Sequence, residues 1–169
     1  KVTGVQTCAL PISDRERFGQ YFDLLSVALR GSSIELPYRY LDIGCGVGHS
    51  VELAQERNMK AVGVEINEVA LKVARSHDRA VFHADSYEPE SAFHVISMFE
   101  TLEHIADTDQ VLAKAKEMLA PGGFLVLTVP NRTAWEIFLQ KQYSFHVFGG
   151  FEGVGHINLF DASEIGRAH

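Results

Sequence analysis

Apolar residues recur along the chain at two spacings, one typical of helices and one typical of buried strands. In residues 14–30 they fall every three or four positions up to Gly31, which predicts an amphipathic helix that ends there. Short apolar runs predict strands at residues 38–43, 61–65, 81–84, 93–98 and 124–129. Helical spacing returns at residues 50–57, 68–75 and 109–119.

Short strands that alternate with helices are typical of βαβ units, in which neighbouring strands run parallel. Right-handed crossovers then place helices on both faces of the sheet. We therefore expect an α/β fold with a mostly parallel sheet flanked by helices. Ligands of such sheets bind at the carboxyl ends of the strands, so function is expected in the loops that follow each strand.

Two local signals mark the ends of the helix predicted at residues 109–119. Asp107 precedes it and is expected to be its N-cap, because an Asp side chain can accept from the first free amides of a helix. Pro121, Gly122 and Gly123 follow the helix and are expected to end it ahead of the last strand.

Composition and charge are those of an ordinary globular domain. The chain has 169 residues, of which 46% are hydrophobic and 22% charged, enough for one buried core. Its formal net charge of -7 argues against nucleic acid or an anionic membrane surface as the main partner. Cys8 and Cys45 provide neither a disulfide framework nor a metal-ligand spacing. We expect a cytoplasmic protein without metal, nucleic acid or membrane partner, whose oligomeric state the sequence does not reveal.

Three glycines at alternate positions follow the first predicted strand, in the segment Asp42-Ile43-Gly44-Cys45-Gly46-Val47-Gly48. Glycine adopts positive φ easily and lets a ligand approach the main chain closely. Such a loop is weakly specific by itself, because several nucleotide-like ligands use it. A nicotinamide-dinucleotide fingerprint needs a further glycine at position 49, where this chain has His49.

Acidic residues stand near the ends of the next two predicted strands. Glu65 ends the second strand, where a carboxylate can accept hydrogen bonds from both hydroxyls of a ribose. Asp85 follows the third strand. A solvated acid at a strand end is the alternative for Glu65, and a turn-forming Asp before Ser86 is the alternative for Asp85.

Five segments together resemble, in order and spacing, the motifs of class I S-adenosylmethionine (SAM)-dependent methyltransferases. They are LDIGCGVGHS, GVEINE, HADSYEPES, ISMFETLEHI and LAPGGFLVLTVPN, within residues 38–131. The likeness is greatest to the small-molecule group that includes the ubiquinone- and sugar-methylating enzymes. It implies a Rossmann-like class I methyltransferase fold, SAM as the cofactor, and methyl transfer to a small-molecule acceptor, for which we expect an oxygen atom.

The resemblance also assigns residues to parts of the cofactor. SAM carries a sulfonium, an ammonium and two ribose hydroxyls, which suit carboxylates, whereas a pyrophosphate prefers glycine amides and basic side chains. No lysine or arginine occurs in these loops. The implied contacts are Asp42, Gly44, Cys45, Gly46 and Gly48 at the methionyl end, Glu65 at the ribose, Ile66, Asp85 and Ser86 at the adenine, and Met98 and Phe99 beside the cofactor.

Candidates for catalysis follow the fourth strand and recur near the end of the chain. Methyl transfer from a sulfonium is an in-line displacement, so the enzyme mainly positions donor and acceptor. A base is needed only where the acceptor must lose a proton. Glu103 and His104, and His156 in a segment that resembles an acceptor-side stretch of the family, are the candidates. Packing and hydrogen bonding within the loop is the alternative role for His104. His156 is a base, a contact of the acceptor, or neither.

The two ends of the chain resemble translated sequencing-adaptor read-through, although a natural N-terminal arm is an alternative for the first. We expect a non-native leader at residues 1–13, the methyltransferase domain at residues 14–163, and a non-native tail at residues 164–169. A complete class I fold ends in an antiparallel pair of strands, and the pattern here stops before it. The domain is therefore expected to be truncated, lacking the C-terminal strand hairpin.

Two other functions stay open at this point. One is a SAM-binding protein or fragment without catalytic activity. The other is an NAD(P)-dependent oxidoreductase with an atypical glycine loop, which His49 and the acidic strand ends disfavour.

Overall fold

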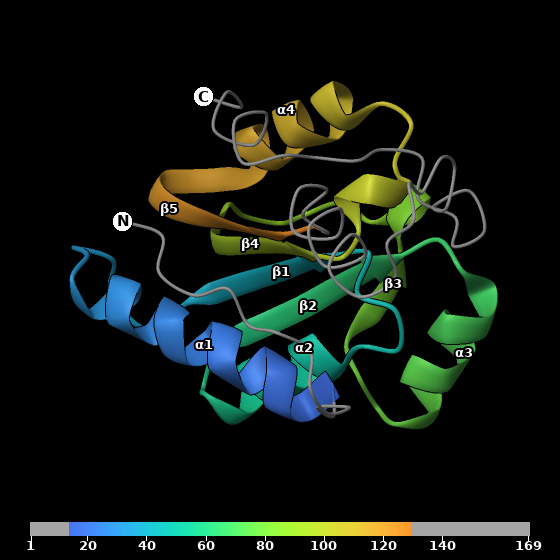
Figure 1. The fold of residues 1–169 in the computed structure, drawn as a ribbon, viewed down its shortest axis with the longest axis horizontal. Coiled ribbons are helices and arrows are strands. Elements are labelled where there is room, and N and C mark those ends of the chain that lie inside the picture. The colour runs from blue at the N-terminus through green and yellow to red at the C-terminus, as the bar shows by residue number, and fades with distance from the viewer. Residues whose placement is uncertain (1–13, 130–169) are drawn as a thin grey trace, which may run out of the picture.

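A computed structural model describes residues 14–129 of the chain, shown in Figure 1. The expected leader at residues 1–13, the expected tail at residues 164–169 and His156 lie outside the described residues. The expected lack of a C-terminal strand hairpin also concerns residues outside this range. The elements in chain order are α1 (Asp14–Arg30), β1 (Arg39–Ile43), α2 (His49–Glu56), β2 (Lys60–Glu65), α3 (Glu68–Ser76), β3 (Val81–His83), the 3₁₀ turn η1 (Ala84–Ser86), β4 (Phe93–Phe99), the 3₁₀ turn η2 (Leu102–His104), α4 (Thr108–Met118) and β5 (Leu119–Thr128).

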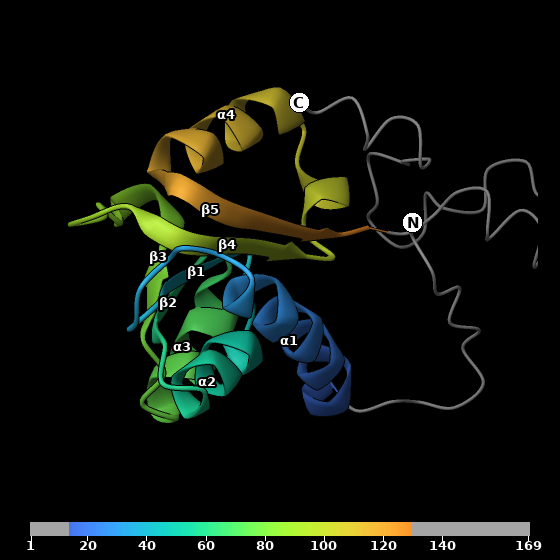
Figure 2. The ribbon, with the colours of Figure 1, turned by 90° about the vertical axis from the view of Figure 1, so that its left-hand side faces the viewer.

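The five strands form one parallel sheet in the order β3-β2-β1-β4-β5. Helices α1, α2 and α3 lie on one side of this sheet and α4 on the other, as Figure 2 shows. The predicted parallel sheet with helices on both faces is therefore confirmed. The strand order reverses between β1 and β4, and the loops after these two strands leave a crevice of the kind that binds ligands in such sheets.

Each face of the sheet buries its own apolar core. Phe22 of α1, Tyr40 of β1 and Val51 of α2 are among the buried residues of the first core. Ile96 of β4 and Ala115 of α4 belong to the second. Side chains alternate between the two faces along a strand, so the central strands contribute to both cores and read as continuous apolar runs.

The boundary between the last described helix, α4, and the last described strand, β5, differs from the prediction. Asp107 caps α4 as expected, because its side chain accepts from the Gln110 amide at 3.0 Å. However, Pro121 and the glycines after it lie within β5, which already begins at Leu119. The pairing of β5 with β4 shifts register just after Leu119, and Gly122 has a φ of 74°. Proline and positive-φ glycine are tolerated there because this part of the strand is irregular.

Beneath the glycine loop, the carboxylate of Asp42 is buried and joins three elements. Asp42 is 2% exposed. It accepts hydrogen bonds from Ser97 of β4, at 2.6 Å, and from Ser50 of α2. The Tyr40 hydroxyl lies 2.6 Å from the Ser97 hydroxyl and extends the network. Burial raises the pKa of Asp42 to about 7, although the two serine hydroxyls act to lower it.

No helix within residues 14–129 is both long enough and apolar enough to cross a membrane.

The raised pKa of Asp42 predicts that stability depends on pH. Its pKa rises from 3.8 to about 7, so between these values the folded protein keeps a proton that the unfolded chain releases. The free energy of unfolding should therefore fall by roughly 3–4 kcal/mol as the pH rises through this window. Asp42→Asn removes the titrating group at nearly constant size and should flatten this dependence, as measured by urea denaturation across the window.

The matched control is Asp109→Asn, which replaces an exposed carboxylate in the first turn of α4. It should keep the pH dependence of the parent protein. An Asp42→Asn variant that loses stability with rising pH as steeply as the parent would contradict the assignment to Asp42.

Candidate cofactor-binding site

A cleft of about 620 Å³ opens at the carboxyl ends of the strands, where parallel sheets bind their ligands. Apolar side chains line most of it, and a few polar groups converge on it, which is the usual composition of a small-molecule site. Its lining residues are Ile43, Gly44, Val64, Glu65, Ile66, Asn67, Ala84, Glu100, Thr101, His104, Ile105 and Val111.

Gly44 ends β1 against the loop that follows β4. Its φ is +73°, in the left-handed region that favours glycine. A β-carbon at this position would lie 2.3 Å from Cγ2 of Thr101, far inside contact distance. Only glycine therefore lets these two loops meet at the floor of the cleft.

Most of the backbone amides of the glycine loop donate to acceptors within the protein. Gly44 and Cys45 both donate to the carbonyl of Val64 in β2, at 2.8 and 3.1 Å. Gly48 donates to the carbonyl of Cys45 at 2.9 Å. These amides cannot at the same time form a cradle for phosphate oxygens, which is how a glycine loop binds a pyrophosphate.

The carboxylate of Glu65 binds the same loop from the end of β2. One of its oxygens accepts from the Gly46 amide at 2.8 Å. The other accepts from the amides of Ile66 and Asn67, at 2.8 and 2.9 Å. A carboxylate has about four acceptor positions, so Glu65 keeps capacity for a further donor in the cleft that it lines. A contact of Glu65 with a ribose hydroxyl stays a prediction, and the remaining acceptor position leaves room for it.

Cys45 points away from the cleft. A β-carbon on Gly63 would lie 2.5 Å from the Cys45 sulfur, so the thiol fills the space that this glycine leaves. Burial raises the pKa of the Cys45 thiol, which keeps it protonated. Its side chain packs against the core beneath the loop, and Cys45 is not among the residues that line the cleft.

The three residues of η1, which follows β3, lie in three different surroundings. Ala84 lines the cleft. Asp85 is exposed at the rim, with one carboxylate oxygen 3.8 Å from Nδ1 of His83. Ser86 instead lines a second groove of about 860 Å³, whose walls include Arg39, Lys60 and Tyr87. A contact of Asp85 with an adenine amino group therefore stays a prediction, and Ser86 is not brought into the cleft.

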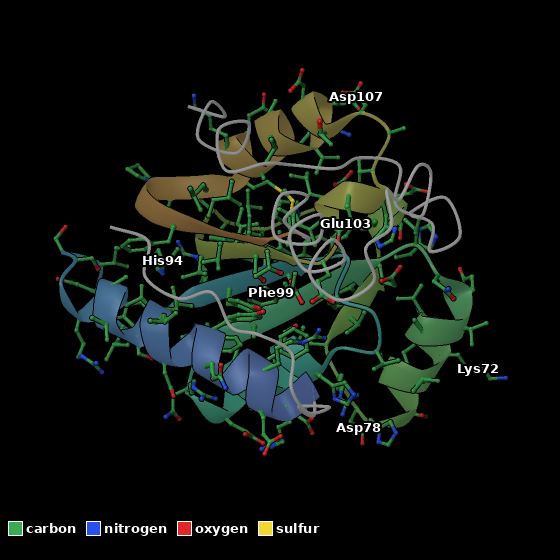
Figure 3. All side chains as sticks on the ribbon, in the orientation of Figure 1. Lys72, Asp78, His94, Phe99, Glu103 and Asp107 are labelled. Carbon is green, nitrogen blue, oxygen red and sulfur yellow. The ribbon has the colours of Figure 1, made fainter. Side chains whose placement is uncertain are left out.

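The two predicted residues of β4 do not line the cleft. Met98 is 0% exposed and packs in the core under α4. Phe99, labelled in Figure 3, points to the opposite face and stacks on Tyr21 of α1, with ring centroids 5.1 Å apart. Glu100 and Thr101, the next residues along the chain, line the cleft instead. The sequence places the strand correctly but does not show which of its last residues turns toward the cleft.

The described catalytic candidates lie in η2 and differ in their access to the cleft. His104 is exposed and lines the cleft. Glu103 is 0% exposed and does not line it, and Figure 3 shows it on the side of α4. Consecutive residues of a 3₁₀ turn point in different directions, which is why the two neighbours separate. Within residues 14–129, the geometry therefore favours His104 over Glu103 for contact with a substrate.

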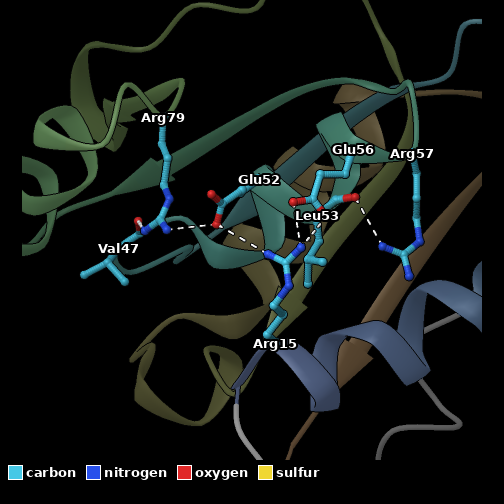
Figure 4. A network of polar contacts seen from close by, with 7 residues as sticks. All are labelled: Arg15, Val47, Glu52, Leu53, Glu56, Arg57 and Arg79. Carbon is cyan, nitrogen blue, oxygen red and sulfur yellow. Dashed lines mark hydrogen bonds and ion pairs between the residues drawn. The ribbon is translucent and has the colours of Figure 1, made fainter.

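Arg79 is a residue of the site region that the sequence did not indicate. It stands between α3 and β3, yet Nη1 of its guanidinium donates to the carbonyl of Val47 in the glycine loop at 2.8 Å. Nη2 donates to the Glu52 carboxylate at 2.9 Å, as Figure 4 shows. The loops themselves contain no lysine or arginine, but the long Arg79 side chain reaches the glycine loop from another element.

Comparison with known proteins gives relatives in sequence and in structure. The ubiquinone biosynthesis O-methyltransferase of Mesorhizobium japonicum is 35% identical over 104 residues, which are 56% of this chain and 42% of that protein. The enzyme of the same description from Thiobacillus denitrificans is 33% identical over 121 residues, which are 66% of this chain and 50% of that protein. The chain thus spans about half the length of the curated relatives it matches.

Solved structures share the fold at lower sequence identity. A SAM-dependent methyltransferase from Archaeoglobus fulgidus superposes with a TM-score of 0.67 at 19% identity, covering 92% of this chain and 67% of that one. The SAM-bound amino pentose methyltransferase CalS10 of Micromonospora echinaspora gives a TM-score of 0.58 at 22% identity, covering 71% and 52%.

The family itself follows from a match over most of the chain. The sequence profile of the methyltransferase domain family matches residues 13–169. This range contains all the described strands and the whole cleft. The chain therefore belongs to the methyltransferase domain family.

Proposed function

We propose that the protein is a class I SAM-dependent methyltransferase that transfers a methyl group to an oxygen atom of a small-molecule acceptor. The observation that carries this proposal is the pairing of Glu65 with a glycine loop in which the amides of Gly44, Cys45, Gly46 and Gly48 already donate within the protein. A loop of this kind offers a carboxylate rather than amide donors to its ligand. The names of the relatives, ubiquinone biosynthesis O-methyltransferases, support oxygen as the accepting atom.

The charges around the cleft favour a cationic nucleoside. Glu65 and Glu100 are its acidic residues, and no lysine or arginine is among its lining residues within the described chain. Glu100 is ion-paired with Arg17 at 2.7 Å, which leaves Glu65 as the main negative charge. A carboxylate in such a site attracts a sulfonium or an ammonium and repels a pyrophosphate.

The shape of the cleft also suits the nucleoside part of SAM. Ile66 adjoins Glu65 and is 70% exposed, so its side chain offers an apolar surface that an adenine ring could cover. Asp85 at the rim could accept from the adenine amino group. Gly44 and the neighbouring loop are left for the methionyl end, close to the carboxyl end of β1.

Bound SAM supplies an electrophilic methyl group on a sulfonium centre. The residues of this chain have to hold that centre in line with the acceptor oxygen and exclude water from it. An acceptor hydroxyl loses its proton as the new bond to oxygen forms, and His104 is the described residue that lines the cleft and can take a proton. We therefore assign the base role to His104 in this proposal.

Isothermal titration with S-adenosylhomocysteine (SAH) and with NADH tests the cofactor. SAH resembles SAM without the methyl group, so the proposal expects clear binding of SAH and none of NADH at the same concentrations. Tighter binding of NADH would contradict the proposal and favour an oxidoreductase. Binding of SAH without methyl transfer to any of a panel of phenols, sugars and catechols would indicate a SAM-binding protein that is not an enzyme.

Glu65→Gln tests the ribose contact. The amide keeps the size of the side chain, but its nitrogen cannot accept hydrogen bonds from the loop or from a ribose. Binding of SAH should weaken by about 1–3 kcal/mol. The control Glu68→Gln changes an exposed carboxylate three positions away in α3 and should leave the SAH dissociation constant unchanged. Equal affinities for the two variants would move the ribose contact to another residue.

His104→Gln tests the base. The turnover number should fall by about 10²–10⁴-fold, whereas the dissociation constant for SAH should stay within about twofold of the parent. His77→Gln, at the exposed end of α3, is the control and should leave both quantities unchanged. A full turnover number in His104→Gln would show that His104 only contributes to the wall of the cleft.

A further inference from the structure

The glycine loop is bonded on two opposite sides. On the inner side, the Val64 carbonyl and the Glu65 carboxylate of β2 accept hydrogen bonds from amides of the loop, as described above. On the outer side, the loop carbonyl of Val47 accepts from Arg79. We infer that Arg79 is a positioning residue, whose guanidinium holds the glycine loop in the shape that binds the cofactor. The inference rests on the proposed function, because it assumes that this loop meets SAM.

Arg79 is itself held firmly in place. Its backbone amide donates to the Ala74 carbonyl at the end of α3, at 3.1 Å. Its side chain is only 9% exposed and reaches both Val47 and Glu52. A planar guanidinium that binds two acceptors at once has a defined orientation, which a single flexible ammonium lacks. The contact to the loop is therefore a directed one.

Val47 lies between two glycines, so its backbone conformation is weakly restrained by the chain itself. Gly46 and Gly48 have φ values of +55° and +83°, and glycines of this kind leave a backbone with many accessible conformations. A hydrogen bond from a charged donor is stronger than one from a neutral donor. The aliphatic part of Arg79 adds packing, because a β-carbon on Gly48 would lie 3.2 Å from its Cδ. Both contacts reduce the conformations that the loop can adopt.

The charge of Arg79 is balanced locally. Gly48 is the N-cap of α2, and the N-terminus of a helix disfavours an isolated cation. Glu52, in the first turn of α2, binds the guanidinium and compensates this charge. Arg79 can therefore adjoin the loop without opposing a cationic cofactor on the inner side.

The same ion-pair network contains a natural control. Arg15 of α1 also approaches Glu52, at 3.9 Å, and binds Glu56 at 2.6 Å (Figure 4). Its side chain is 56% exposed, and both of these partners belong to α2 rather than to the glycine loop. Removing Arg15 disturbs the ion pairs of α2 while the bond to Val47 stays in place, so the two arginines separate loop positioning from general stability.

The test compares Arg79→Ala, Arg79→Lys and Arg15→Ala with the parent protein. We measure the SAH dissociation constant by titration, amide hydrogen exchange at residues 45–49, and the melting temperature. Arg79→Ala should weaken SAH binding by about tenfold or more and speed exchange at these loop amides selectively. Arg79→Lys should rescue part of both effects, because one ammonium can bind the carbonyl or the glutamate but does not reproduce the fork. Arg15→Ala should bind SAH within about twofold of the parent.

The remaining outcomes distinguish a failure of the inference about Arg79 from a failure of the proposed function. Unchanged SAH affinity and loop exchange in Arg79→Ala would overturn the inference and leave the function intact. A general rise in exchange that is equal in Arg79→Ala and Arg15→Ala would show a structural role only. A parent protein that does not bind SAH would overturn the function, and loop exchange alone would then decide the role of Arg79. If Arg79→Ala does not fold, Arg79→Lys and Glu52→Gln replace it, and SAH affinity and loop amide exchange are measured on both. Each variant weakens the hydrogen bonds that Arg79 makes to Val47 and Glu52 or that hold its guanidinium in place, so each should weaken SAH binding and speed loop exchange.

Discussion

The hydrogen bond from the Gly46 amide to the Glu65 carboxylate joins the two loops on which the site depends. It turns the glycine loop toward β2 and, at the same time, keeps a negative charge at the edge of the cleft. Asp42 supports the loop from beneath through α2 and β4, and Arg79 supports it from outside. A dinucleotide site needs the loop amides free for phosphate, whereas this arrangement uses them internally and presents a carboxylate. The conformation of the loop therefore favours a positively charged ligand over a phosphate.

Much of the fold could be predicted from the sequence because its signals are local or repeat along the chain. Within residues 14–129, apolar runs and helical spacing predict the five strands and four helices to within a few residues, apart from the start of β5. Parallel strands end on one edge of the sheet, so residues at strand ends, such as Gly44 and Glu65, could be expected to meet, and they line the same cleft. Asp107 could be assigned as a cap for the same local reason.

The features that could not be predicted depend on contacts between distant segments. Met98 and Phe99 are neighbours at the end of one strand, and only the positions of α1 and α4 decide that neither side chain faces the cleft. Glu103 looked as accessible as His104 in the sequence, but the packing of η2 buries it. Arg79 carries no motif, and its contact with the loop appears only when the start of β3 is placed beside the loop. Such residues have no periodicity or spacing that would reveal them.

The proposed place of the cofactor is the cleft at the carboxyl ends of β1, β2 and β4. A backbone NMR titration of the protein with SAH tests this most directly, because each amide reports its own surroundings. Binding of SAH in this cleft should give the largest shift changes at Gly46, Ile66 and Thr101, which lie within or beside it. Shift changes gathered instead around Lys60 and Tyr87, in the second groove, would contradict it.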